Sequence, residues 1–95
     1  GLALFNTQQY LEAIDSFRKS ISLKEDWNSF RGLGWAYFQK NQFNEAIDAF
    51  HKALALKKDL STYKKLAQSY QKAGDTNSSI HYSKIYLSNL LVSAY

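Results

Sequence analysis

The sequence repeats with a period of 33 residues, and this interval limits the folds open to the chain more than any other feature. Small residues recur at one position of the period, isoleucine at the next, and aliphatic residues at a third. The three series are Ala13, Ala46 and Ser79; Ile14, Ile47 and Ile80; and Ile21, Leu54 and Leu87. Units of this length cannot bury their apolar faces alone, so they stack against one another.

The spacing of apolar residues within each unit favours helices. Ala13, Ile14, Phe17 and Ile21 lie three or four residues apart, which places them on one face of an α-helix. The chain contains no proline and only four glycines, a composition that argues against turn-rich β folds. We therefore predict an all-α fold, in which antiparallel helix pairs stack into a right-handed solenoid of about two and a half repeats with a concave face.

Polar residues between the apolar segments predict one domain made of three units. Asp26 and Asp59 each precede a new segment, where an aspartate can accept hydrogen bonds from the free amides of a first helical turn. We expect a truncated first unit over residues 1–26, a complete unit over 27–59 and a third over 60–95. The chain would then be a fragment of a longer array, with the turn of its first unit at residues 7–9.

Two glycines carry structural information. Gly34 falls in the middle of a predicted helix, where glycine costs about 1 kcal/mol relative to alanine, so we expect another helix to approach closely there. Gly74 follows the last periodic residue of a helix and can adopt the left-handed conformation that ends helices.

The middle unit resembles the tetratricopeptide repeat, a helix-turn-helix pattern of aromatic and small residues in a fixed order. The matching residues are Phe30, Leu33, Gly34, Tyr37, Ala46, Phe50 and Ala53. Two features differ: the period is one residue shorter than is usual in that family, and Glu25 and Lys58 stand where it has proline. The resemblance implies a protein-protein interaction scaffold that binds a peptide or helix of a partner.

In that family the first helix of each pair lines a concave groove. The resemblance assigns the following groove positions: Phe5, Asn28, Arg31, Trp35, Phe38, Lys64, Lys65, Gln68 and Lys72. Aromatic and cationic side chains together favour an acidic or aromatic peptide. Two simpler interpretations stay open, namely that Phe5 and Phe38 pack against neighbouring helices and that the lysines form an ordinary solvated face.

Chaperone-binding members of the family hold a terminal carboxylate with a clamp of lysine, asparagine and arginine. This chain lacks the clamp, because Leu2 and Trp35 stand where it needs asparagine and Ser61 where it needs lysine. A separate expectation is self-association, since solenoid ends need polar caps and the ends of this chain are apolar. The residues expected at that contact are Leu2, Tyr86, Leu90, Leu91 and Tyr95.

Other classes of function find less support in the sequence. We expect no enzyme or cofactor site, because the sequence contains no Gly-rich phosphate loop, nucleophile elbow or paired-carboxylate cleft. We expect no metal site either, because Asp48 and His51 form a one-turn pair without the third ligand that zinc requires. No apolar run in the sequence is as long as a transmembrane helix, which needs about 20 residues. The absence of cysteine is compatible with a reducing compartment, so a cytoplasmic location is favoured.

The alternative to a protein ligand is RNA, which some helical-repeat proteins bind base by base. The net charge of +4 and the many aromatic residues would suit it. Acidic residues recur at equivalent positions of the units, however, and they interrupt any continuous basic stripe. These residues are Glu12, Asp15, Glu45 and Asp48.

Overall fold

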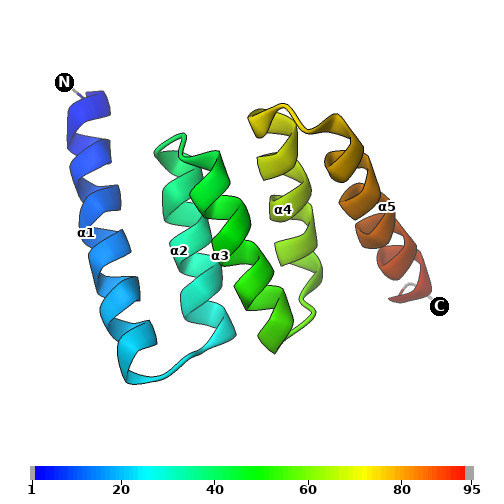
Figure 1. The fold of residues 1–95 in the computed structure, drawn as a ribbon, viewed down its shortest axis with the longest axis horizontal. Coiled ribbons are helices and arrows are strands. Elements are labelled where there is room, and N and C mark those ends of the chain that lie inside the picture. The colour runs from blue at the N-terminus through cyan, green and yellow to red at the C-terminus, as the bar shows by residue number, and fades with distance from the viewer. Residues whose placement is uncertain (1, 94–95) are drawn as a thin grey trace.

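The described residues form five α-helices, which stand side by side in a row with the two ends of the chain at opposite ends of the row (Figure 1). The computed structural model describes residues 2–93, and side-chain surroundings for residues 8–91. The helices are α1 (Leu2–Leu23), α2 (Trp27–Gln39), α3 (Phe43–Leu56), α4 (Leu60–Ala73) and α5 (Thr76–Ser93). The described residues contain no strand, so the all-α prediction is confirmed.

The helices step along an axis and do not close around a centre. Each helix contacts the next one in the chain, and α2 also contacts α4. Among the described residues, α1 and α5 make no contact with each other, and the molecule is elongated, with extents of 42 × 30 × 20 Å. This arrangement is that of a helical-repeat solenoid, as the repeat period predicts.

The predicted turn at residues 7–9 is wrong, because α1 continues through these residues as one helix of 22 residues. The two other turns show the physical reason. Asn41 and Gly74, which lie in the turns after α2 and α4, have positive φ angles of 64° and 92°. The equivalent position of the first unit is Gln8, and glutamine has neither the freedom of glycine nor the left-handed tendency of asparagine.

The two predicted aspartate caps, Asp26 and Asp59, are confirmed. The carboxylate of Asp26 accepts a hydrogen bond of 3.4 Å from the amide of Asn28, and that of Asp59 accepts one of 3.2 Å from the amide of Thr62. These bonds satisfy amides that have no partner inside a helix. Gly74 ends α4 in the left-handed conformation, which confirms the predicted helix stop.

The core consists of two adjoining clusters. Ile14, Leu33, Ala36 and Ala49 join α1, α2 and α3. A second cluster of Ala46, Phe50 and Leu66 joins α3 to α4.

Gly34 confirms the predicted close approach. A β-carbon at Gly34 would lie 2.7 Å from the ring of Phe50, which is fully buried. The small residue therefore lets α3 come close to α2.

Candidate functional site

A half-open cavity of about 330 Å³ lies where α2 and α4 come together, and it contains three of the predicted groove residues. Its lining is Arg31, Gly32, Trp35, Phe50, Ser61 and Lys65. Phe50 is fully buried and forms an apolar floor, whereas the side chain of Trp35 is 41% exposed. The cavity thus combines an apolar interior with two cations at its edge.

Trp35 is fixed at the edge of this cavity by a second aromatic ring. The ring of Tyr10 from α1 lies edge-on to it, with the ring centres 5.6 Å apart and the planes at 80°. Such edge-to-face pairs are favourable, and here the pair restrains an indole that is otherwise open to solvent. Tyr10 is not among the predicted groove residues, because the turn expected at residues 7–9 would have put it in the second helix of the first unit.

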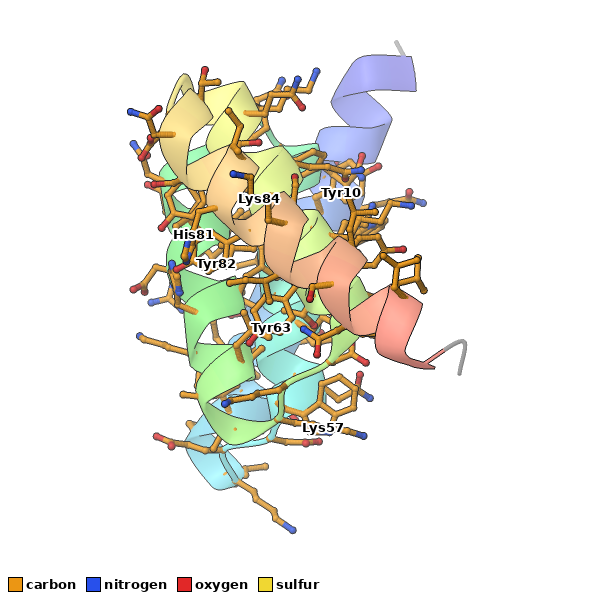
Figure 2. The ribbon with its side chains drawn as sticks, turned by 90° about the vertical axis from the view of Figure 1, so that its right-hand side faces the viewer. Tyr10, Lys57, Tyr63, His81, Tyr82 and Lys84 are labelled. Carbon is orange, nitrogen blue, oxygen red and sulfur yellow. The ribbon has the colours of Figure 1, made fainter. Side chains whose placement is uncertain are left out.

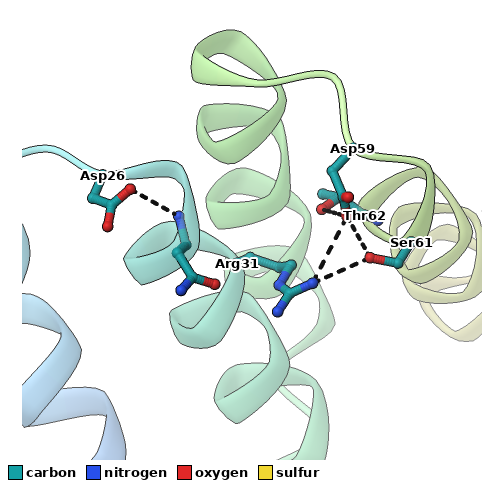
Figure 3. A network of polar contacts seen from close by, with 6 residues as sticks. Asp26, Arg31, Asp59, Ser61 and Thr62 are labelled. Atoms are coloured by element: carbon teal, nitrogen blue, oxygen red, sulfur yellow. Dashed lines mark hydrogen bonds and ion pairs between the residues drawn. The ribbon is translucent and has the colours of Figure 1, made fainter.

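Arg31 is held by residues of α4 and its N-terminal cap. One guanidinium nitrogen donates a hydrogen bond of 3.2 Å to the Ser61 hydroxyl and lies 3.8 Å from an Asp59 carboxylate oxygen (Figure 3). Ser61 donates to the same carboxylate, as does the Thr62 hydroxyl. The charge of Arg31 is therefore partly engaged before any ligand arrives.

The same network alters the acidity of Asp59. Burial alone would raise its pKa, but the hydrogen bonds from Ser61 and Thr62, together with Arg31, outweigh that effect and leave the pKa below the ordinary value of 3.8. Asp59 is thus ionised in both of its roles, as helix cap and as partner of Arg31.

Lys65 differs from Arg31 in having no carboxylate partner among the described residues. Its ammonium lies 5.9 Å from the centre of the Phe38 ring, within the range of a cation–π contact. Phe38 is half-buried and packs edge-on against Phe43, with ring centres 5.3 Å apart. Phe38 therefore packs against a neighbouring helix, the simpler of its two interpretations. Its ring also contacts the ammonium of Lys65.

The remaining predicted groove residues lie elsewhere. Lys64 and Gln68 line a different cavity, between α4 and α5. Asn28 and Lys72 are exposed, and neither lines the cavity between α2 and α4. Phe5 falls outside the residues whose side chains the structure describes. The predicted set is therefore divided between two surfaces.

A second aromatic residue of α2, Trp27, holds two cations. The guanidinium carbon of Arg31 lies 5.3 Å from the centre of its ring, and the ammonium of Lys57 lies 4.6 Å from it. Lys57, labelled in Figure 2, extends from the end of α3. Sequence spacing gave no sign of this contact, because Trp27 and Lys57 are brought together only by the pairing of α2 with α3.

His51 lies in a cluster of tyrosines that joins α3 to α4 and α5. Its Nε2 is 2.7 Å from the Tyr70 hydroxyl, and its ring packs edge-on against Tyr82, 5.6 Å away. Tyr70 and Tyr82 are stacked in parallel, 5.5 Å apart. Burial lowers the pKa of His51, an effect that Asp48 partly offsets, and burial also raises the pKa of Tyr70. These contacts hold neighbouring helices together.

The residues predicted for self-association are described in part. Leu90 and Leu91 are 44% and 64% exposed on α5, and Tyr86 is half-buried at the cavity between α4 and α5. The side chain of Leu2 and the whole of Tyr95 fall outside the described residues. Self-association through these positions stays a prediction.

The described part of the chain carries neither a metal-binding cluster nor a membrane-spanning helix. It holds no cluster of three or more histidines, cysteines or acidic residues that could bind a metal ion. Among its helices, none combines the length and the apolar character needed to cross a membrane.

Comparison with known families bears on most of the chain. Residues 27–60 match a family model described as the tetratricopeptide repeat, and residues 1–26 match a second model with the same description. No curated protein matches the chain. Together the two models cover α1, α2 and α3, which include Arg31 and Trp35.

Proposed function

Because the chain belongs to the tetratricopeptide repeat family, whose repeats generally mediate protein–protein interaction, we propose that it binds a segment of another protein in the cavity between α2 and α4. The observation that carries the proposal is the convergence of Trp35, Arg31 and Lys65 on one half-open cavity. Exposed tryptophan and arginine side chains at the centre of a surface commonly supply much of the binding energy of protein interfaces.

The lining of the cavity indicates the chemistry of the ligand. An apolar floor at Phe50 suits an aromatic or aliphatic side chain, and the exposed face of Trp35 can cover it. Lys65 supplies a positive charge that no carboxylate neutralises among the described residues. The ligand is therefore a peptide segment in which an acidic residue neighbours an aromatic or aliphatic one.

Lys65 contributes more to this binding than Arg31 does. A carboxylate that approaches Arg31 has to compete with Asp59, 3.8 Å from the guanidinium, and with the hydroxyl of Ser61. A carboxylate that approaches Lys65 displaces only water and a cation–π contact. Ion pairs that need no prior pair to be broken give the larger net gain.

The test is titration of the chain with a short synthetic peptide that carries aspartate and glutamate around one phenylalanine. With Trp27→Phe in the background, Trp35 is the remaining tryptophan and its fluorescence reports occupancy of the cavity. We expect Lys65→Glu to weaken binding about tenfold or more, the change that ~1.4 kcal/mol produces. Trp35→Ala, followed by calorimetry, should weaken binding to a similar extent.

Lys64→Glu is the matched control, since it makes the same charge change at the neighbouring residue but on the other surface. Equal losses in Lys64→Glu and Lys65→Glu would show that the peptide responds only to net charge and would contradict the cavity as its site. Retention of the chain on immobilised RNA at physiological salt, with no binding of the peptide, would favour the nucleic-acid alternative.

A further inference from the structure

The end of the molecule formed by α4 and α5 carries a second cavity, of about 250 Å³. Figure 2 looks onto this end, with Lys84 labelled on α5. Lys64, Gln68 and Gln71 of α4 line the cavity together with Ser83, Tyr86 and Leu87 of α5. Leu87 is 54% exposed, so a large apolar side chain at the edge of the cavity is uncovered in this structure.

The repeat shows what kind of element fits this face. One period earlier, Trp35, Phe50 and Leu54 stand where the end face has Gln68, Ser83 and Leu87. In that earlier unit α4 covers the surface, because Leu66 packs on the fully buried Phe50 and Leu54 is half-buried beside them. The end face thus repeats the surface on which a helix sits within the molecule, and no described residue covers it.

We propose that this end face binds an amphipathic, acidic helix of a partner protein, seated on α4 and α5 as α4 is seated on α2 and α3. The replacement of Phe50 by Ser83 creates space where the inner unit has a phenyl ring. A bulky apolar side chain from the middle of the partner helix fills that space, where the inner unit has Phe50 itself.

Charge determines the flanks of the partner helix. From Leu60 onward the chain contains four lysines against Asp75 alone. Lys64 lines the cavity, and Lys72 and Lys84 are exposed on the two helices that form it. Glutamates one turn before and after the apolar anchor would meet these lysines, and complementary charge of this kind also accelerates encounter.

Two other occupants fit this face less well. A second copy that docked the same face onto itself would bring the lysines of the two ends together, and like charges across an interface are unfavourable. A permanently packed helix would favour the apolar lining of the inner unit, whereas this face has glutamine or serine in place of Trp35, Phe38, Ala46 and Phe50. Interfaces of mixed polarity are typical of partners that dissociate.

The test uses two synthetic amphipathic helices with a central phenylalanine, one flanked by glutamates and the other by lysines, and titrates them against Trp35→Ala, in which the cavity between α2 and α4 no longer competes for the acidic helix. We expect the chain to bind the acidic helix and not the basic one. The double variant Ala67→Gly/Ser83→Phe restores the glycine–phenylalanine pair of the inner unit and fills the cavity without the clash that a β-carbon would make with the ring, so binding should fall about tenfold or more. Lys64→Glu should weaken binding similarly, and Lys65→Glu, which lies in the other cavity, should leave it unchanged within about twofold.

Circular dichroism of Ala67→Gly/Ser83→Phe should match that of the original chain, so that lost binding is not lost folding. Equal binding of the acidic and basic helices would overturn the proposal, as would an unchanged affinity in this double variant. Sedimentation that shows a dimer abolished by the double variant would assign the face to a second copy instead. Lys64→Glu tests the cavity between α4 and α5, and Lys65→Glu tests the cavity between α2 and α4. Failure of the end-face proposal can therefore be distinguished from failure of the proposed function.

Discussion

The ring of Phe50 lies against the backbone of Gly34 so closely that a β-carbon on the glycine would meet it at 2.7 Å. Phe50 is fully buried, so the ring has little room to move away. One period later the pair becomes Ala67 and Ser83, and the smaller partner there leaves space for a methyl group. The close contact of α2 with α3 therefore depends on the pair, not on glycine alone.

Gly34→Ala should destabilise the chain even though alanine is the better helix former. We expect a loss of about 1–3 kcal/mol in the free energy of unfolding, typical of an overpacked core. Gly32→Ala provides the comparison, because its β-carbon would meet Phe17, which is only half-buried and can shift. Urea denaturation should rank Gly34→Ala as the more damaging change, and the reverse order would contradict the packing argument.

Asp59 should matter more for stability than Asp26, although both residues cap a helix. Asp59 accepts hydrogen bonds from Ser61 and Thr62 and pairs with Arg31, whereas Asp26 accepts one bond of 3.4 Å. We expect Asp59→Ala to cost about 1–2 kcal/mol and Asp26→Ala clearly less. Thermal denaturation of both variants at neutral pH measures the difference, and equal losses would show that Arg31 adds nothing to the cap.

The stability that Asp59 contributes through the same network should decrease at acidic pH. The pKa of Asp59 is lowered in the folded chain, so its contribution is complete above the ordinary value of 3.8 and is lost as the pH falls below it. Asp59→Asn should therefore flatten the acid limb of the stability curve below about pH 4. An unchanged acid limb in Asp59→Asn would contradict this assignment.

His51 should make the fold sensitive to pH in a higher range. Burial, partly offset by Asp48, holds its pKa below the ordinary value of 6.5, so the unfolded chain takes up a proton first as the pH falls. Stability should then decrease from about pH 8 to about pH 5. The groups that face the ring from α4 and α5 are the phenols of Tyr70 and Tyr82, and burial raises the pKa of Tyr70.

His51→Phe removes the titrating group and keeps an aromatic ring beside Tyr82, so the loss of stability between those pH values should shrink. His81→Phe is the matched control, since His81 also packs edge-on against Tyr82, at 4.9 Å, but is exposed. Guanidinium denaturation at each pH supplies the measurement. A similar reduction in both variants would show that His51 is not the source.

Salt should weaken binding of the acidic peptide in the cavity between α2 and α4. Electrostatic interactions are screened over about 10 Å at 0.1 M salt and over about 3 Å at 1 M. The salt dependence should be smaller in Lys65→Met than in the original chain, because that variant lacks the unpaired cation. Fluorescence titrations at several salt concentrations would show this, and an equal dependence in both chains would place the ion pair elsewhere.

Local chemistry made several elements of the fold predictable from the sequence. Asp26 and Asp59 indicate helix starts in the sequence, because their side chains accept hydrogen bonds from amides only two or three residues away. Gly74 indicates a helix end, because glycine readily adopts the left-handed backbone conformation found there. The turn at residues 7–9 was predicted from the repeat alone, but Gln8 lacks the conformational freedom that Asn41 and Gly74 bring to the other turns.

The candidate site was less predictable, because its arrangement depends on contacts between helices. Trp35 and Lys65 could be assigned to one groove by their positions in the repeat. The ion pair between Arg31 and Asp59 could not be predicted, because these residues lie 28 positions apart and their side chains meet only after α2 and α4 have packed. Lys64 and Lys65 show the same limit, as neighbours in sequence that line different cavities.

The unbroken first helix has a consequence for how the molecule opens. Within the described residues α1 is attached to α2 alone, while α3 is attached to helices on both sides. Detachment of α1 therefore breaks one interface and leaves the rest of the row standing, so amide protons of α1 should exchange with solvent sooner than those of α3. The same event would release Tyr10 from Trp35, which links local opening at one end of the row to the shape of the groove.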